Sequence, residues 1–344
     1  MKIECPHCPQ VYDIPEERFP AGQKRIAFPC PACKGTIRID LSESMVKEDI
    51  RKLSKSTGNE ALDHQSLKRE IMRSVTDLPP LPQVVIKANE IMADTSSTFK
   101  ELGDVIETDQ AIAGRVLKLA NSAYYGLKGM VSSIHQASVV LGFEALGELI
   151  TVVGAAGLLD NILKGYGLES GSLWQHSLAV AFGSRIIARK ITPKFENSAF
   201  SAGLLHDAGK IILNEYVLEK EDEFDTFLKV EGRTFLEAEK KILGFDHAEI
   251  SSDLCQKWSI PDSQCAAIRY HHYPSKSEGS SLANIVHIAD ILAMKSGAGT
   301  GFDSMLYEME EGVSELVGLS AADLEEVVTE MLESVDKISE EIQH

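Results

Sequence analysis

From residue 68 onward the chain has the spacing of apolar residues that helices require, and little of the alternation that strands require. Five apolar residues at the start of this region share one helical face: Val84, Val85, Ala88, Ile91 and Met92. The stretch DQAIAGRVLKLANSAYYG repeats the pattern, and SSIHQASVVLGFEALGELITVVGAAGLL predicts two segments around Gly142. We therefore expect residues 68–344 to form an all-α, multi-helix domain.

The first forty residues are organised around four cysteines. These form two C-x2-C pairs about twenty residues apart: Cys5, Cys8, Cys30 and Cys33. Such pairs are typical of a structural zinc site in a reducing compartment, with two disulfides or a redox C-x-x-C as the alternatives. The segment is too short to fold on an apolar core alone. The runs KRIAF and GTIRI predict strands, so we expect a zinc ribbon with short β-hairpins over residues 1–40. It resembles the small zinc-ribbon modules of bacterial regulatory proteins.

Composition divides the rest of the chain. Residues 41–67 are polar and predict a linker. The all-α domain that follows is divided into a helical subdomain (68–165), a core with the candidate site (166–300) and acidic C-terminal helices (301–344). The last of these helices has one apolar stripe: Leu324, Val327, Val328, Met331 and Leu332. We expect the stripe to pack back onto its own domain, with a partner-binding helix as the alternative.

Charge limits the expected partners. The net charge of −18 disfavours non-specific attraction to nucleic acid or anionic lipid. The segment SIHQASVVLGFEALGELI is too apolar to be a DNA-reading helix-turn-helix, and a DNA-binding regulator that uses the ribbon is a minor alternative. No long apolar run or signal peptide is recognisable, so we expect a cytoplasmic protein without a membrane partner.

Histidine and aspartate residues stand in unusually apolar surroundings. In SAGLLHDAGKIIL, His206 and Asp207 lie within what reads as an apolar helix. Similar candidates follow along the chain: His176, His247, His271, His272 and Asp290. Each alone has an ordinary explanation, such as a core histidine or a helix cap. Together, buried imidazoles and carboxylates suit Fe, Mn, Zn, Ni or Co, as one ion or as two if a carboxylate bridges.

The order of these residues resembles that of the HD superfamily of metal-dependent phosphohydrolases. The sequence looks closest to the HDOD branch, the output domains of bacterial signalling proteins. The supporting stretches are LPPLPQVV, IETDQAIAGRVLKLANSAYYG, SIHQASVVLGFEALGEL and LANIVHIADILA. The resemblance spans roughly residues 68–330, and LKLANSAYYG is its most specific part.

The resemblance implies a ligand set. A first metal would be held by His176, His206, Asp207 and Asp290. Asp207 would bridge to a second metal, held by His247, His271 and His272. Lys210, one turn after the pair, would stabilise a phosphate oxygen, so the resemblance assigns catalytic roles to Asp207 and Lys210. A bound metal can generate hydroxide near neutral pH, which suits hydrolysis of phosphate esters.

Two functions follow from this resemblance. The first is a signalling protein that hydrolyses a nucleotide or another phosphate ester as a phosphohydrolase or phosphodiesterase. The alternative is a non-catalytic HDOD output module that binds a signalling protein partner. The text HHYPSKSEGSSLAN lacks the Gly-rich element of cyclic-dinucleotide phosphodiesterases, and Ser172 stands where a further carboxylate ligand is possible.

Overall fold

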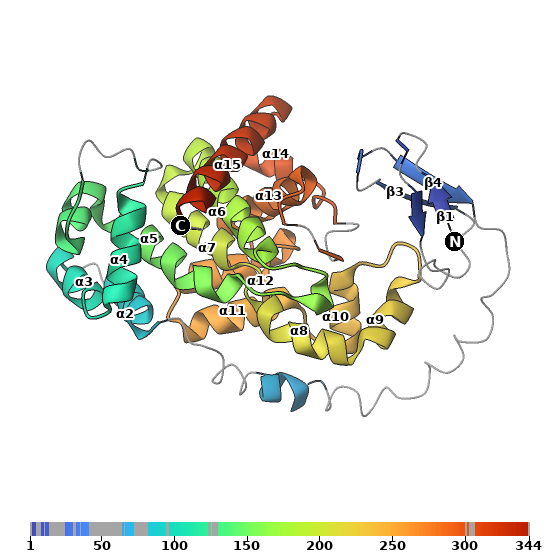
Figure 1. Ribbon diagram of the computed structural model, residues 1–344, viewed down its shortest axis with the longest axis horizontal. Helices are drawn as coiled ribbons and strands as arrows, with labels where there is room; N and C mark the ends of the chain where they lie inside the picture. Colours follow the sequence, from blue (N-terminus) through green and yellow to red (C-terminus); the bar gives the residue numbers. More distant parts are fainter. Residues whose placement is uncertain are drawn as a thin grey trace.

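The computed structural model describes the chain in segments, which are residues 2–4, 8–9, 11–13, 25–29, 32–34, 36–40, 64, 66–71, 82–93, 96–122, 125, 130–299, 301–302 and 307–342. Within these ranges, every named element after residue 40 is a helix (Figure 1). The predicted all-α class is therefore confirmed. Most of the predicted linker, residues 41–67, falls outside the described residues, and the domain boundaries stay predictions.

The N-terminal segment contains two short antiparallel hairpins. Strand β1 (Lys2–Glu4) pairs with β2 (Val11–Asp13), and β3 (Arg25–Pro29) pairs with β4 (Thr36–Asp40). The strands β3 and β4 coincide with the predicted runs KRIAF and GTIRI. Cys8 lies between β1 and β2, and Cys33 lies in the turn between β3 and β4. Cys5 and Cys30 lie outside the described residues.

Four helices form the first part of the all-α region: α2 (Gln83–Ala93), α3 (Phe99–Ile106), α4 (Gln110–Ala120) and α5 (Ile134–Leu159). Side-chain caps start three of them, because Thr98, Asp109 and Ser133 each accept a backbone N–H of the first turn. Gly142 interrupts α5 with a φ of +85°, a conformation that glycine adopts without strain. The two halves of α5 meet at 114°, which confirms the predicted break.

Helix α6 (Ser172–Ile191) is the centre of the fold. It packs against α7 (Glu196–Leu205), α13 (Ser281–Ser296) and α15 (Ala321–Ile342). Gly203 allows α7 to approach closely, since a Cβ there would come within 2.7 Å of the Val180 carbonyl oxygen. Nearly all of α6 is consequently buried, including polar residues on both of its halves.

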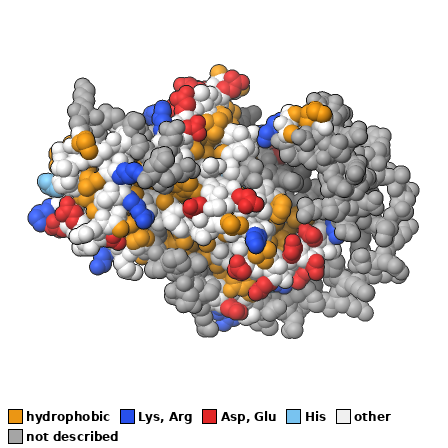
Figure 2. All heavy atoms as spheres, viewed as in Figure 1, with side chains coloured by type: hydrophobic (Ala, Val, Ile, Leu, Met, Phe, Trp, Pro, Cys, Tyr) orange, Lys and Arg blue, Asp and Glu red, His pale blue; other side chains and the backbone are white. Residues whose placement is uncertain are grey.

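The remaining helices surround this centre. They are α8 (Gly209–Glu219), α9 (Glu221–Leu228), α10 (Phe235–Ile242), α11 (His247–Lys257), α12 (Asp262–Arg269) and α14 (Val313–Val317). Short 3₁₀ turns lie at Lys164–Tyr166 (η3), Pro193–Phe195 (η4) and Pro274–Ser277 (η5). Acidic side chains gather over the region of α8 to α10 and over α15 in Figure 2, for example Glu221, Asp222 and Glu223 of α9.

The C-terminal helix α15 packs back onto the domain, as its apolar stripe predicts. Ser320 caps it by accepting the Asp323 backbone N–H. Val327 and Met331 are fully buried against the core, and the other stripe residues are partly buried there. The expected stripe is therefore an intramolecular contact.

None of the described helices is by itself long and apolar enough to cross a membrane. The two halves of α5 meet the length and composition criteria only when taken together, across their sharp bend.

Candidate metal site

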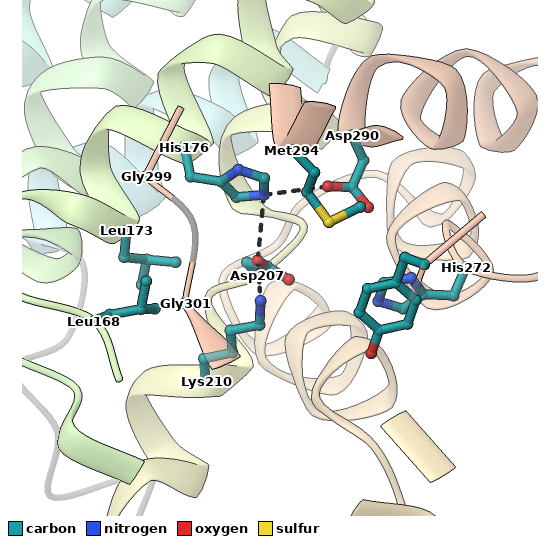
Figure 3. Close-up of a pocket in the computed structure, with 11 residues that line it drawn as sticks. Leu168, Leu173, His176, Asp207, Lys210, His272, Asp290, Met294, Gly299 and Gly301 are labelled. Carbon is teal, nitrogen blue, oxygen red and sulfur yellow. Dashed lines mark hydrogen bonds and ion pairs between the residues drawn. The ribbon is translucent and has the colours of Figure 1, made fainter. Parts of the chain in front are cut away.

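Residues from five segments of the chain converge at one buried point. His176 comes from α6, the His206–Asp207 pair from the α7–α8 junction, His247 from the start of α11, and Asp290 from α13. His271 and His272 follow α12 directly. All of these side chains are buried except His272, which is half-buried. Figure 3 shows His176, Asp207, Asp290 and His272 around one cavity.

The position of the His206–Asp207 pair differs from the sequence-based expectation. The pair was expected inside one apolar helix, but α7 ends at Leu205 and α8 begins at Gly209. The intervening backbone is tightened, since the N–H of Ala208 bonds to the carbonyl of Leu205, three residues back. Gly209 allows the α7–α8 junction to approach α11 closely, because a Cβ at this position would lie 2.4 Å from the His247 carbonyl oxygen. Close approach to α11 thus brings Asp207 next to His247.

Asp207 occupies the middle of the cluster, with its two oxygens facing different histidines. Its Oδ2 lies 3.3 Å from His206 Nε2 and 3.6 Å from His176 Nε2. Its Oδ1 lies 3.3 Å from His247 Nε2 and 3.9 Å from His271 Nε2. This arrangement fits a carboxylate that is shared between two ligand groups.

Lys210 and Asp290 complete the charges of the cluster. Lys210 Nζ donates to Asp207 Oδ2 at 2.5 Å. Asp290 Oδ1 lies 3.2 Å from His176 Nε2 and 3.7 Å from His206 Nε2. The structure therefore brings together every His, Asp and Lys residue that the resemblance implied, while the role of each as a ligand stays a prediction.

Three of the histidines are oriented by a hydrogen bond from Nδ1 to a backbone carbonyl oxygen. His176 bonds to the Ala298 carbonyl oxygen at 3.2 Å, and His206 bonds to that of Gly203 at 2.7 Å. His271 bonds to the Ile268 carbonyl oxygen at 2.7 Å. Because a carbonyl oxygen only accepts, Nδ1 carries a proton, and Nε2 is the nitrogen that faces the cluster. The same arrangement orients metal-binding histidines in general.

Two buried atoms of the cluster lack any hydrogen-bond partner among the described residues. They are Asp207 Oδ1 and His271 Nε2, both of which are acceptors in these protonation states. An unsatisfied buried acceptor is costly, and a metal ion satisfies both at once. Three sets of side chains place their ligand atoms within 4.8 Å of one another: His176, His206 and Asp207; His206, His271 and Asp290; and His247, His271 and His272. The residues therefore fit a metal ion.

The two carboxylates of the cluster are held in the ionised form. Burial opposes ionisation of Asp207, but the charges of His206 and Lys210 outweigh it and hold the pKa of Asp207 well below its usual range. Burial likewise opposes ionisation of Asp290, whose pKa is lowered by the hydrogen bond with His176 and by the charge of His206. Both groups are thus anionic at neutral pH.

The histidines divide into two kinds. Burial and the charge of His206 lower the pKa of His271 to about 3. Burial and the nearby His271 lower the pKa of His272 well below its usual range. For His247, burial opposes protonation, but the carboxylate of Glu239 raises the pKa to about 9. For His176, burial is outweighed by Asp290, which raises its pKa. His271 and His272 are therefore neutral and ready to donate a lone pair.

Sequence reasoning missed several residues that surround the cluster. Glu239 accepts hydrogen bonds from His247, and the Tyr166 hydroxyl donates to Glu239. His287 donates from Nδ1 to the His271 carbonyl oxygen, and Tyr307 stacks on the His272 ring at 4.7 Å between centroids. A sequence signal existed for Glu239 only, which shares a helical face with Phe235 and Ile242.

The cavity at the cluster is very small. It is lined by the ligand candidates together with Lys210 and by an apolar and glycine-containing wall: Leu168, Leu173, Met294, Gly299, Gly301 and Tyr307 (Figure 3). Its free volume of about 10 Å³ is on the order of what a single water requires. Gly299 lies against α6, since a Cβ there would meet the Ser172 carbonyl oxygen at 2.0 Å.

Helices that gather a histidine, a His-Asp pair and further His and Asp residues at one buried point define an HD-type metal-site domain. The family model of the HDOD domain matches residues 78–274, more than half of the chain, and that of a zinc-ribbon domain matches residues 1–38. This chain belongs to the HDOD family, and a zinc-ribbon module precedes the HDOD domain.

Relatives and solved structures agree with this family. An uncharacterized protein of Treponema pallidum (strain Nichols) is 25% identical over 242 residues, which cover 66% of this chain and 45% of that protein. The chain thus spans less than half the length of this curated relative. An HDOD domain protein of unknown function from Geobacter sulfurreducens is 27% identical, with a TM-score of 0.60 over 81% of this chain and 94% of that chain.

Two further solved structures share the fold at lower identity. A candidate signal transduction protein from Marinobacter aquaeolei VT8 is 22% identical, with a TM-score of 0.65 over 92% of this chain and 75% of that chain. A candidate phosphohydrolase from Shewanella amazonensis SB2B is 22% identical, with a TM-score of 0.56 over 76% of this chain and 97% of that chain. At this identity, both similarities establish the fold alone.

Proposed function

We propose that this chain is a bacterial cytoplasmic signalling protein whose His/Asp cluster binds one or two divalent metal ions and hydrolyses a phosphate ester, such as a nucleotide. The observation that carries the proposal is the position of Asp207. Its Oδ2 faces His176 and His206, whereas its Oδ1 faces His247 and His271. A carboxylate shared in this way supports two adjacent metal positions.

The proposed ligands fall into two groups around Asp207. His176, His206, Asp207 and Asp290 hold the first metal, and Asp207, His247, His271 and His272 hold the second. A bound divalent ion would supply Lewis-acid chemistry and lower the pKa of a water molecule from about 15.7 toward 7. Fe, Mn, Zn, Ni and Co all suit this mixture of imidazole and carboxylate ligands.

Lys210 is the proposed phosphate-binding residue. Its Nζ lies inside the cavity at 2.5 Å from Asp207 Oδ2, and the side chain is buried. In this position its positive charge would stabilise an anionic oxygen of a phosphoryl group better than a solvated lysine does, because little water screens the interaction. Asp207 keeps Lys210 in place between turnovers.

The size of the cavity favours a second function, the non-catalytic output module. About 10 Å³ of free volume does not admit a phosphate ester. A substrate of that size reaches the metal ligands only if the wall formed by Gly299, Gly301 and Tyr307 moves. In the alternative function the metal stabilises the domain, and the surface of the domain binds a signalling protein partner.

The ribbon adds a second metal to the proposal. Cys5, Cys8, Cys30 and Cys33 are proposed to bind one structural zinc ion, as four thiolates complete a closed tetrahedron. The match of the zinc-ribbon family to residues 1–38 supports this assignment. Neighbours that are named for signal transduction support a signalling context for the whole chain.

A metal analysis combined with a substrate screen tests both functions. The full chain is purified without added metal, its metal content is measured, and phosphodiester and nucleotide substrates are screened. Beyond the zinc of the ribbon, we expect bound metal and turnover in the wild type, loss of both in Asp207→Ala, and loss of turnover with retained metal in Lys210→Met. His135→Ala, an exposed histidine of α5, serves as the matched control and leaves both unchanged.

The outcomes separate the two functions. Metal that is bound without turnover of any substrate supports the output module. If neither the wild type nor any variant binds metal beyond the zinc of the ribbon, the ligand assignment is wrong and both functions lose their site.

A further inference from the structure

Glu239 is a carboxylate buried in the interior of the protein, yet it belongs to none of the three candidate ligand sets. It lies on α10 with no exposed surface, and the Tyr166 side chain beside it is equally buried. Burying a carboxylate is costly unless hydrogen bonds replace its hydration. The partners of Glu239 therefore indicate why it is there.

Three donors converge on the two oxygens of Glu239. Oε2 accepts from His247 Nδ1 at 2.7 Å and from the His247 backbone N–H at 3.1 Å. Oε1 accepts from the Tyr166 hydroxyl at 2.5 Å. The carboxylate is thus fixed on one side by Tyr166, and on the other side it fixes both the backbone and the ring of His247.

The direction of these bonds excludes Glu239 as a ligand of the metal ion that His247 is proposed to bind. The two nitrogens of an imidazole point away from each other, and Glu239 binds Nδ1. The opposite nitrogen, Nε2, lies 3.3 Å from Asp207 Oδ1 and 2.8 Å from His272 Nε2. Glu239 therefore acts on the cluster through His247 and not by direct contact.

Tyr166 is itself held in place. Its ring packs against Phe235 at 5.1 Å between centroids, and the backbone N–H of Gly165 donates to Asn214 Oδ1 of α8. The ring also lies 5.7 Å from Lys210 Nζ. Tyr166 and Glu239 consequently connect α8, which carries Lys210, to His247 at the start of α11.

We propose that Glu239, fixed by Tyr166, is a positioning residue that holds His247 in the Nδ1–H tautomer with Nε2 directed at the second metal position. This inference rests on the proposed metal site and deepens it. The other oriented histidines bond to backbone carbonyls, so His247 is distinct among them in depending on a carboxylate side chain.

Two measurements on the full chain test the proposal. Histidine NMR of the metal-free protein, recorded above pH 9 where the His247 ring is neutral, reports its tautomer directly. Calorimetric titration with Mn²⁺ reports the affinity of the His/Asp cluster, because thiolates of the ribbon bind Mn²⁺ poorly. Loss of an outer hydrogen-bond partner typically weakens metal binding about 10- to 100-fold.

We expect Glu239→Ala to lose the fixed Nδ1–H tautomer and to bind Mn²⁺ about 10- to 100-fold more weakly. Glu239→Gln keeps one acceptor oxygen, so it retains the tautomer and recovers part of the affinity. Tyr166→Phe leaves the Glu239–His247 bond in place and loses affinity by a smaller factor, and it provides a test if Glu239→Ala does not fold.

Glu237→Ala is the matched structural control. Glu237 lies on the same helix, is exposed, and completes the capping box with Thr234. Its loss lowers the melting temperature without affecting the tautomer or Mn²⁺ binding. The proposal is overturned if Glu239→Ala keeps the tautomer and the affinity, or if Glu237→Ala weakens Mn²⁺ binding equally. If the wild type binds no Mn²⁺, the proposed function fails, while the tautomer comparison still decides the role of Glu239.

Discussion

Helix α6 carries two buried clusters of charge, and they are built in opposite ways. In its second half, Arg185 bonds to Glu148 of α5 at 2.5 Å, and the Tyr125 hydroxyl donates to the same carboxylate. In its first half, His176 faces the carboxylates of Asp207 and Asp290. The Arg185 cluster pairs one guanidinium with one carboxyl group, whereas the His176 cluster brings several imidazoles and two carboxylates together around a single lysine.

The difference separates a structural ion pair from a binding site. The Arg185 guanidinium also lies over the rings of Phe182 and Phe200, at 5.1 and 5.0 Å, so its charge faces one carboxyl group and two aromatic rings of the protein. At the other cluster, Asp207 Oδ1 and His271 Nε2 have no hydrogen-bond partner among the described residues. Two buried acceptors without donors fit a cation from outside the chain.

The largest expected effect on stability comes from breaking the ion pair. Arg185→Met leaves the buried Glu148 without its cation, and we expect the free energy of unfolding to fall by about 3–5 kcal/mol. Metal content stays that of the wild type. Chemical denaturation measures the first quantity and elemental analysis the second.

Arg189→Met is the matched control for this prediction. Arg189 lies one turn further along α6 and pairs with Glu196 and Glu330, but its side chain is 46% exposed. An exposed pair contributes about 0–1 kcal/mol, so the variant loses little stability. Equal losses in both variants, or an altered metal content in Arg185→Met, contradict the structural role assigned to Arg185.

The next effect concerns the other cluster. Asp290→Asn keeps the shape of the side chain but removes an anionic ligand, so we expect the affinity for Mn²⁺ to fall at least about 100-fold, or about 2.7 kcal/mol. Calorimetric titration measures the affinity.

Asp253→Asn is a suitable control, because this partly exposed carboxylate pairs with Lys68 and Arg269 and belongs to none of the candidate ligand sets. We expect it to bind Mn²⁺ like the wild type. Unchanged affinity in Asp290→Asn would remove Asp290 from the ligand set.

These two clusters also show how far sequence carries the prediction. The helices were predictable because their apolar periodicity is local, and the order of His and Asp residues indicated the metal site. The pair Glu148–Arg185 was not predictable from the sequence, because it joins residues 37 positions apart on two helices and neither residue type is distinctive alone.

The details of the site depended on packing that no local pattern encodes. The sequence placed His206 and Asp207 within a helix, since the surrounding run is uniformly apolar, whereas contact of Gly209 with α11 sets the junction there. Glu239 shares a helical face with Phe235 and Ile242, but no local pattern indicates that its carboxylate contacts His247. Its burial follows from Tyr166, which is 73 residues away.

The stabilisation that added metal provides also distinguishes the Arg185 cluster from the His/Asp cluster. Mn²⁺ at about 100 times its dissociation constant should stabilise the metal-free wild type by about 2.7 kcal/mol. Arg185→Met should gain the same free energy of unfolding from Mn²⁺, although it starts from a lower stability, because distant sites contribute additively. Thermal denaturation with and without Mn²⁺ measures the gain. A gain in Asp207→Ala equal to that of the wild type would show that the ion binds elsewhere.

The smallest expected effect is a pH dependence of that gain. In the metal-free protein the pKa of His247 is about 9, above the usual 6.5, so its protonated form stabilises the fold fully below pH 6.5 and this contribution is lost as the pH rises toward 9. A metal ion requires the neutral ring and competes with this proton. The stabilisation by Mn²⁺ should therefore increase from pH 6.5 to pH 8, by up to about 1.4 kcal/mol per pH unit for one proton. A gain that is flat or falls over this range would mean that His247 does not bind the ion.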